Sequence, residues 1–400
     1  MNVACDSAAP FLDVCQSPEI YDAVGDVLGR RPQRVDLERT HFPGKRPVQL
    51  VLHAVMPDGQ AYPVLAEHCP EDPHSHADRA RVSLGKSRNG QRNGLDATAL
   101  RVVAGAGLVL RRPGLDERLP GLRLLYDPAF ARTALQSVIG KDPRDIAVEL
   151  VAHRLGRRAV LRITSRDRVV YARLRAIKSS NGADRLGRHR ELWHSLSRQS
   201  DLRIPEPLGA IPDIGVAFFG VLPGTPPDFG ASDSTATTRA IRALQALEPA
   251  GLPVHTGADE ARILVEWLNR CHRWRPGIAA RVAAPVAQIS AALKRSDASP
   301  RPCHRDLHEK QILIADSIAG LLDFDTLCLS DPALDVGNLL AHLYLAEVDE
   351  APVRSHLRMS GIALWRRGAL LRLAMIYAFT STPARVLDRL IREGTTDAED

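Results

Sequence analysis

One run of residues constrains this chain more than any other, HRDLHEKQILI at 304–314, followed by LLDFD at 321–325. The first part is typical of a short loop that enters a β-strand, and the second of a strand that ends on an acidic pair. This layout predicts that Asp306, Gln311 and Asp323 lie at neighbouring strand ends, where their side chains converge. One carboxylate can then take a proton from a hydroxyl group, while an amide and a second carboxylate offer oxygens to Mg²⁺.

The same spacing is typical of phosphoryl-transfer sites. Kinases carry H-R-D-x-x-x-x-N, where the Asp orients the acceptor hydroxyl and the Asn binds metal, and then D-F-G, whose Asp binds metal. Here the series is HRDLHEKQ and DFD, so glutamine stands at the asparagine position. The extra methylene of Gln311 moves its carbonyl oxygen by about 1.5 Å, which argues against a second metal ligand placed as in other kinases.

HRDLHEKQILI, followed by LLDFDTLCLSDPALDVGNLLAHL, resembles the aminoglycoside phosphotransferase and choline-kinase-like family. The resemblance is close over 301–345 and looser over 140–380. It implies the α+β class and a bilobal protein-kinase-like fold, with an antiparallel-sheet N-lobe and a mainly helical C-lobe. An additional α+β N-terminal region would precede these lobes.

The resemblance also implies the chemistry of the site. ATP would donate its γ-phosphate to a hydroxyl of a small molecule, Asp306 would act as catalytic base, and Asp323 and Gln311 would bind Mg²⁺. His304 and Asp335 would support the loop without taking part in proton transfer.

In the N-lobe, VVYARLRA at 169–176 resembles the strand that presents a lysine to the α- and β-phosphates, and Arg173 stands at that position. Arginine keeps the charge but replaces a compact ammonium by a planar fork. Glu191 matches the helix glutamate that pairs with this cation. Phe219 and Val221 match the hinge that binds adenine through its backbone.

Strand alternation places Tyr171, Arg173 and Arg175 on one face of this strand. The turn LGRR at 155–158 stands where a G-x-G-x-x-G loop is expected. Its arginines either hold phosphates by charge or form an exposed hairpin tip. Lys178, beyond the strand, is a weaker candidate cation.

Two histidines of the predicted catalytic loop, His304 and His308, allow other interpretations. His308 can approach a substrate or phosphate, or be a solvated loop residue. With His304 it forms an HxDxH pair that also occurs in zinc sites, but no third ligand follows at a convincing spacing. The pattern therefore disfavours a metal-dependent hydrolase.

A chain of 400 residues exceeds the length at which a single core usually stops growing. We predict an α+β N-terminal region at 1–140, an N-lobe at 141–224, a C-lobe at 225–393 and a disordered tail at 394–400. The N-lobe should contain three consecutive strands, a helix and a further strand, and the C-lobe helices are expected at 260–273, 278–294, 332–347 and 361–380.

Within the N-terminal region, apolar runs predict strands at 47–55, 61–66 and 100–110, and the polar stretch 70–96 is predicted to be a long loop. A helix is expected at 127–138, capped by its aspartate and begun by proline.

Two segments of the chain are similar to each other, HFPGKRPV at 41–48 and HRLGRRAV at 153–160. Each is followed by an apolar strand, a turn that contains Asp, and a tyrosine, Tyr62 or Tyr171. Either a β-hairpin was duplicated to give a degenerate repeat, or two unrelated hairpins share similar turn chemistry.

Composition excludes several other classes. The net charge of +6 is modest, and aromatic residues make up only 4%, so a nucleic-acid partner is not favoured. Six scattered cysteines without a C-x-x-C pair favour a reduced, cytoplasmic protein. No apolar run approaches the roughly 20 residues of a membrane helix, and no secretory signal is present. The expected partners are a nucleotide and a small-molecule acceptor, and oligomeric state is not predicted.

Two functions stay open at this point. The first is an active small-molecule kinase, and the alternative is a nucleotide-binding pseudokinase that acts as a regulatory or scaffold module. Arg173 and Gln311 depart from the family pattern, but they keep a charge and an amide, which favours the kinase. Several arginines on the expected C-lobe helices argue against a polycationic aminoglycoside and favour a neutral or anionic acceptor, such as a sugar or an amino alcohol.

Overall fold

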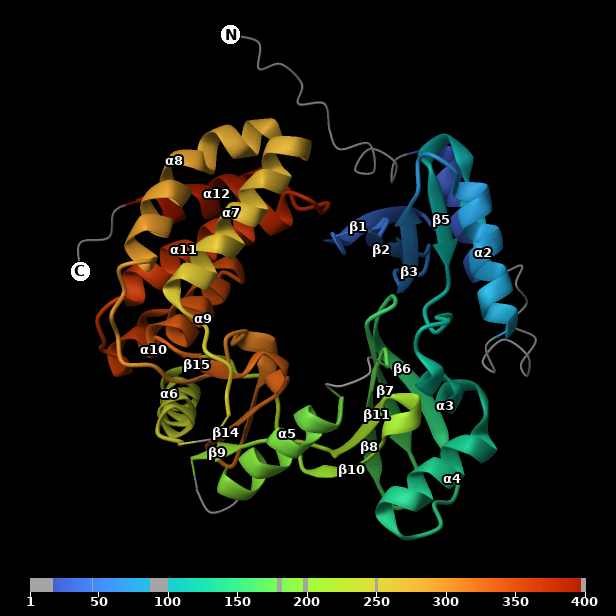
Figure 1. The fold of residues 1–400 in the computed structure, drawn as a ribbon, viewed down its shortest axis with the longest axis horizontal. Helices are drawn as coiled ribbons and strands as arrows, with labels where there is room; N and C mark the ends of the chain where they lie inside the picture. The colour runs from blue at the N-terminus through green and yellow to red at the C-terminus, as the bar shows by residue number, and fades with distance from the viewer. Residues whose placement is uncertain are drawn as a thin grey trace.

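The computed structural model describes residues 17–44, 46–86, 100–177, 182–196, 201–248 and 251–396. Three units surround a central space, with two sheets one above the other on the right of Figure 1 and a mainly helical C-lobe on the left. The fold is therefore α+β, with the predicted antiparallel-sheet N-lobe, helical C-lobe and additional N-terminal region.

The N-terminal region is built on a five-stranded antiparallel sheet in the order β1-β2-β3-β5-β4. Its elements are α1 (Pro18–Leu28), β1 (Arg34–His41), β2 (Val48–Val55), β3 (Ala61–His68), α2 (Pro73–Lys86), β4 (Leu100–Val103) and β5 (Leu108–Arg111). Apolar residues of α1 such as Ile20 and Val24 pack in one core with alternate residues of the strands, such as Leu52 and Val64. One face of the sheet is thereby buried, as the period of two predicts.

The N-lobe repeats this design with a second sheet in the order β6-β7-β8-β11-β10. Its elements are α3 (Arg123–Tyr126), α4 (Pro128–Ile139), β6 (Ala147–Arg154), β7 (Arg158–Thr164), β8 (Val169–Arg175), α5 (Gly182–Leu196), β10 (Pro207–Ile211) and β11 (Val216–Gly220). Asp127 caps α4 by accepting a hydrogen bond from the Phe130 amide at 3.0 Å. Ala131 and Leu135 of α4 pack on Leu161 and Ala172, so α4 belongs structurally to this sheet although the sequence boundary was set at 140.

The similarity between the two sheets extends well beyond the hairpin that the sequence pairs. Each has a helix between its third strand and the next strand of the sheet, α2 or α5, and each has a one-residue bulge in its first strand. Each last strand follows a 3-10 turn that ends on a left-handed glycine, Gly107 at φ 61° or Gly215 at φ 65°. The same topology thus occurs twice, and descent of both units from one ancestor stays a prediction.

The C-lobe is mainly helical, with short strands that flank the predicted catalytic segments at 304–325. Its helices are α6 (Ala231–Gln245), α7 (Gly257–Trp274), α8 (Pro276–Leu293), α9 (Ala333–Leu345), α10 (Ala351–His356), α11 (Ile362–Tyr377) and α12 (Ala384–Thr395). Its strands are β12 (Arg301–Cys303), β13 (Ile312–Ala315), β14 (Ile318–Leu321) and β15 (Cys328–Ser330), and β9 (Leu202–Arg203) joins β14 in parallel. None of the helices in the described ranges is long and apolar enough to cross a membrane.

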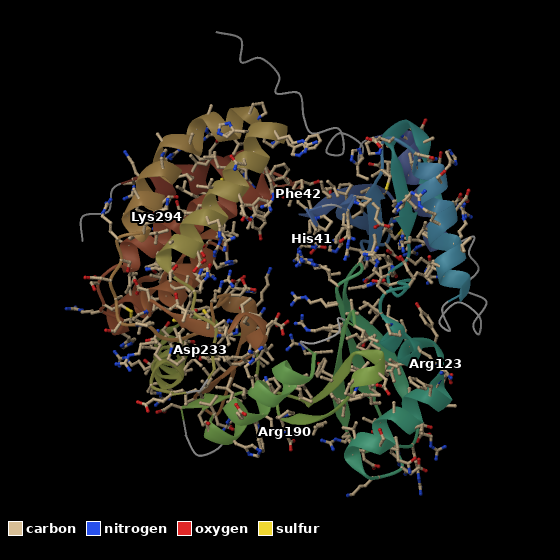
Figure 2. All side chains as sticks on the ribbon, in the orientation of Figure 1. His41, Phe42, Arg123, Arg190, Asp233 and Lys294 are labelled. Atoms are coloured by element: carbon tan, nitrogen blue, oxygen red, sulfur yellow. The ribbon has the colours of Figure 1, made fainter. Side chains whose placement is uncertain are left out.

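The N-terminal sheet also touches the C-lobe, which closes the ring of units. Phe42 at the end of β1 lies between Trp267 and Phe379, with ring centroids 6.0 and 5.0 Å away (Figure 2). The Ser381 amide donates to the Leu37 carbonyl at 2.7 Å. This contact fixes β1 beside the loop between α11 and α12.

Three local predictions need correction. The strand predicted at 100–110 is a pair of antiparallel strands, β4 and β5, because a 3-10 turn at 104–106 reverses the chain between them. The polar stretch 70–96 is not one long loop, because it contains α2, whose Ala77, Ala80 and Leu84 pack on Leu100 and Val109. The apolar residues of α2 are few and small and are separated by charged residues. The hydrophobic periodicity that indicates a helix is therefore weak in this stretch. The disordered tail predicted at 394–400 is wrong for its first two residues, which belong to α12, and residues 397–400 lie outside the described part.

Candidate active site

The catalytic loop follows β12, as the sequence predicts. Arg305 adopts a left-handed backbone conformation with φ 70°, and Asp306 is exposed beside it. The His304 side chain is buried, and its Nε2 lies 2.6 Å from the Leu322 carbonyl oxygen, to which it can donate. Because Leu322 directly precedes Asp323, this bond holds the Asp306 loop beside the Asp323 segment.

The loop is supported from below by Asp335, which is completely buried at the start of α9. Its two carboxylate oxygens each accept a backbone hydrogen bond at 2.7 Å, one from His304 and one from Arg305. These bonds hold the strained backbone of Arg305 in place. The structural role predicted for Asp335 is consistent with this geometry.

A second network supports the other end of the loop. The Asn338 side chain donates to the Leu307 carbonyl at 2.8 Å and accepts from Arg372 at 2.5 Å. Arg372 also pairs with Glu260, whose other oxygen lies 3.0 Å from His255 Nε2. Burial alone would raise the pKa of Glu260, but Arg372 and then His255 lower it to about 2.

Replacing Glu260 by glutamine should therefore lower the free energy of unfolding at pH 7 by about 3 kcal/mol. A carboxyl whose pKa falls from 4.5 to about 2 on folding stabilises the fold above pH 4.5, and this contribution is lost as the pH falls towards 2. Urea unfolding of both proteins at pH 7, 4.5 and 3 should show a difference that shrinks with acidity. A difference that stays constant with pH would contradict the assignment.

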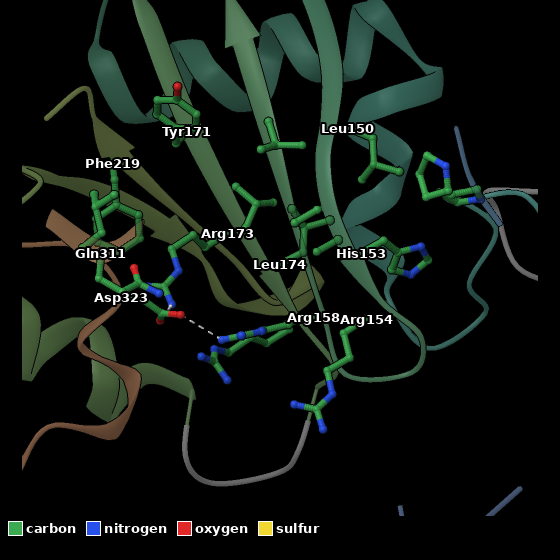
Figure 3. Close-up of a pocket in the computed structure, with 18 of the residues that line it drawn as sticks. Leu150, His153, Arg154, Arg158, Tyr171, Arg173, Leu174, Phe219, Gln311 and Asp323 are labelled. Atoms are coloured by element: carbon green, nitrogen blue, oxygen red, sulfur yellow. Dashed lines mark hydrogen bonds and ion pairs between the residues drawn. The ribbon is translucent and has the colours of Figure 1, made fainter. Parts of the chain in front are cut away.

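Asp323 lies opposite Arg173 and Arg158 of the N-lobe (Figure 3), and Asp325, two residues later, is paired with the same arginines. Asp323 accepts from Arg173 at 2.6 Å and from Arg158 at 3.1 Å, and Asp325 lies 2.7 Å from Arg173 and 3.1 Å from Arg158. Arg175 pairs with Asp325 as well. Burial would raise the pKa of Asp323, yet Arg173 and Arg158 hold it below its ordinary value. Asp323 is therefore ionised, and both carboxylates are paired with guanidinium cations.

The predicted alternation of β8 agrees with this arrangement. Tyr171, Arg173 and Arg175 line the cavity, while Val170 and Ala172 are buried in the core on the opposite face. From the sequence, Arg158 was a candidate only as one of the two arginines of the 155–158 turn, and its pairing with Asp323 and Asp325 was not predicted. It pairs across β7–β8 with Arg175, so a register prediction for this hairpin would have found it.

Glu191 is not brought to Arg173. Its side chain is exposed on α5, and Arg173 is paired with the two C-lobe carboxylates instead. The inner face of α5 presents His189, which lies 4.9 Å from the Phe219 ring and 2.8 Å from the Pro205 carbonyl oxygen. Burial lowers the pKa of His189 to about 4, so the imidazole is neutral. The helical period explains this outcome. Residues two positions apart lie on nearly opposite sides of a helix, so Glu191 faces outward when His189 faces inward.

The predicted hinge residues lie at the cavity. Phe219 ends β11 with a buried ring, and the Arg173 guanidinium lies 5.7 Å from the centre of that ring. Val221 lines the cavity and is 49% exposed. Lys178, the alternative cation, lies outside the described residues.

Gln311 also lines the cavity, close to Asp323 in Figure 3. Its amide nitrogen lies 3.3 Å from His308 Nε2, which leaves the carbonyl oxygen as the atom that can face a cation. A carboxylate and an amide oxygen at one cavity wall fit the oxygen ligands that Mg²⁺ prefers. The donor set is therefore suited to a magnesium ion bound with phosphates.

The turn between β6 and β7 is held by the N-terminal region. Asp116 accepts from the Gly156 amide at 2.5 Å and lies 3.1 Å from His153 Nε2, and both the Asp116 and His153 side chains are buried. The Gly114 amide donates to His153 Nδ1 at 3.0 Å. The turn is thus anchored and is not a free hairpin tip.

These residues surround a cavity of about 690 Å³. Its walls come from the N-lobe sheet, from Gln311 and Asp323 of the C-lobe, and from β1, β2 and β3 of the N-terminal region. The sequence predicted the first two walls, and the third was not expected. Such a volume is in the range of small-molecule sites.

The sequence model of the phosphotransferase enzyme family matches residues 92–371. No curated protein matches the sequence. A Ralstonia eutropha protein assigned as an aminoglycoside phosphotransferase superposes with a TM-score of 0.50 at 13% identity, over 67% of this chain and 97% of that one. This likeness shows a shared fold.

Two further solved structures are similar at lower scores. A thermostable mutant of an aminoglycoside phosphotransferase has a TM-score of 0.49 at 14% identity, over 66% of this chain and 100% of that one. A choline/ethanolamine kinase family protein from Mesorhizobium loti has a TM-score of 0.48 at 14% identity, over 67% and 99%.

Proposed function

The chain belongs to the phosphotransferase enzyme family, and we propose that it moves the γ-phosphate of ATP onto a hydroxyl of a small molecule. The acceptor would be a sugar, an amino alcohol or a related metabolite. A cytoplasmic location, where nucleoside triphosphates are plentiful, is part of this proposal. The observation that carries it is the bond from His304 to the Leu322 carbonyl, because it couples the loop of Asp306 to the segment of Asp323.

In the proposed step, Asp306 orients the acceptor hydroxyl and takes its proton. The bond from the γ-phosphorus to the oxygen that bridges to the β-phosphate breaks, and a bond to the hydroxyl oxygen forms. ADP and the phosphorylated acceptor are the products. Asp306 is exposed, so an acceptor can reach its carboxylate.

Bound Mg²⁺ would supply positive charge against the phosphates, and Asp323 and Gln311 would hold it through oxygen atoms. Arg173 and Arg158 would exchange their carboxylate partners for phosphate oxygens, which a guanidinium binds with two parallel hydrogen bonds. Adenine would lie against Phe219 and the backbone around Val221.

The pseudokinase alternative also has an observation in its favour. Asp323 and Asp325 are both paired with arginines, so these ion pairs compete with a metal ion for the same carboxylates. If the arginines bind these carboxylates more strongly than a metal ion does, the site binds nucleotide weakly or without metal. Binding measurements decide between the two functions.

Calorimetric titration with the non-hydrolysable analogue AMP-PNP, with and without Mg²⁺, is the test. We expect Mg²⁺-dependent binding by the natural protein, and at least about a tenfold weaker Kd for Asp323→Asn, equivalent to about 1.4 kcal/mol. Asp316→Asn is the matched control, because Asp316 is 83% exposed in the turn between β13 and β14.

Binding that does not respond to Mg²⁺ or to Asp323→Asn would support the pseudokinase. No binding of AMP-PNP or of the corresponding GTP analogue would overturn both functions.

A further inference from the structure

The wall that the N-terminal region adds to the cavity has no counterpart in a two-lobed kinase arrangement. Glu38, Arg39 and His41 of β1 line the same cavity as Asp323. Figure 2 places His41 at the inner edge of the N-terminal sheet, facing the central space. The docking of Phe42 on the C-lobe holds β1 in this position.

β1 also reaches the region of the catalytic loop. Burial raises the pKa of Tyr377 at the end of α11. The charge of Arg39 lowers this pKa, and the charge of Glu309 raises it. Arg39 and Glu309 are therefore both near Tyr377, and Glu309 is three residues after Asp306. The end of α11 therefore has residues of both the N-terminal wall and the loop of Asp306 in its neighbourhood.

Four basic side chains, Arg39, His41, Arg154 and Arg158, line the cavity, and the exposed Arg157 lies beside them in the turn. Arg39 and His41 come from β1, and Arg154, Arg157 and Arg158 come from the ends of β6 and β7 and the turn between them. In Figure 3 the Arg154 side chain lies beyond Arg158 as seen from Asp323. The residues interact strongly, since burial and then Arg157, Arg158 and Arg39 lower the pKa of Arg154 to about 10.

Two arginines of this basic cluster, Arg154 and Arg157, have no carboxylate partner among the described residues, whereas Arg158 and Arg39 have one or more. Arg158 is paired with Asp323 and Asp325, and Arg39 has only Glu38, at 3.7 Å. No ion pair with a described residue is found for Arg154 or Arg157, and the Arg154 Nε is buried without a hydrogen-bond partner. Burial of an unpaired guanidinium is costly, so such an arrangement calls for an anion.

We propose that this cluster without Arg158, named here the Arg154 cluster (Arg39, His41, Arg154 and Arg157), binds a phosphate group carried by the acceptor, while Arg158 stays with Asp323 and the donor. The proposal rests on the proposed function, and it assigns the N-terminal region the role of completing the acceptor site. Several guanidiniums around one point suit a phosphate monoester, with its two negative charges and three terminal oxygens. The product would then carry two phosphate groups.

The test is a calorimetric titration of inorganic phosphate into the full chain saturated with AMP-PNP and Mg²⁺. Because the nucleotide site is already occupied, this titration measures the proposed acceptor-phosphate site separately from the donor site. We expect phosphate binding that Arg154→Ala and Arg39→Ala each weaken about tenfold or more, with the Kd for AMP-PNP changed less than twofold. Arg132→Ala is the matched control, because Arg132 is a half-exposed arginine of α4 paired with Asp142.

Equal phosphate binding by all four proteins, or none by the natural protein, would overturn the inference and leave the proposed function standing. Weaker AMP-PNP binding by Arg154→Ala would assign the cluster to the donor and also overturn it. If AMP-PNP does not bind at all, the proposed function fails, and the same variants titrated with phosphate alone still decide the anion site.

Turnover gives a second, independent measurement. ADP release should be stimulated by phosphorylated alcohols, such as hexose monophosphates and glycerol phosphate, and much less by the same alcohols without phosphate. Arg39→Ala should raise the KM for the phosphorylated acceptor at nearly constant kcat. Preference for the phosphate-free alcohols would overturn the inference.

Discussion

Asp306→Asn should lower kcat for phosphate transfer by about 10²–10⁴-fold, the usual contribution of a general base. The amide keeps the size of the side chain but cannot accept the hydroxyl proton. The Kd for AMP-PNP should change little, because Asp306 does not line the cavity wall that holds Arg173 and Asp323. The measurement is the rate of ADP formation with an acceptor that supports turnover by the natural protein.

Asp316→Asn is again the control, since it makes the same chemical change at an exposed turn of the same lobe. Both variants should unfold at the same denaturant concentration as the natural protein. Turnover by Asp306→Asn within a few fold of the natural rate would remove Asp306 from the proposed role.

Asp335→Ala should lower the free energy of unfolding by about 4 kcal/mol, because it leaves two buried backbone N–H groups without acceptors at about 2 kcal/mol each. Burial raises the pKa of Asp335, while the amides of Arg305 and His304 act in the opposite direction. The loss should appear as a lower denaturant midpoint with little change in slope. The His304–Arg305 turn should also become more susceptible to hydrogen exchange.

Asp388→Ala controls for the loss of an aspartate on the C-lobe surface. Asp388 pairs with Arg281 at 2.7 Å, with both side chains nearly half exposed, and such a pair contributes about 0–1 kcal/mol. If the two variants were equally stable, the hydrogen bonds of Asp335 would not be what holds the loop.

Much of the fold could be predicted because its signals are local. The strand alternation of β8 and the Asp127 cap of α4 each depend on neighbours within a few residues. α2 was missed because its apolar residues are few and small, and they gain their burial only from Leu100 and Val109 on other elements. The internal similarity was detected at one hairpin, while its extension to a whole sheet required the strand order.

Part of the candidate site could likewise be predicted from local sequence, and part of it could not. Residues 304–325 form one compact segment, so the sequence alone determined that Asp306, Gln311 and Asp323 lie near one another. Which cations meet these carboxylates was decided by the tertiary structure, since Arg158 and Asp323 are 165 positions apart. The packing of α5 likewise selected His189 over Glu191.

The sequence by itself determined the family motifs, the two-lobed plan and the catalytic loop, because short-range backbone preferences and hydrophobic periods specify them. Only the tertiary structure placed β1 against the cavity and brought Arg39 and His41 towards Arg154. That placement depends on the docking of Phe42 between Trp267 and Phe379, a long-range packing contact that no local pattern encodes.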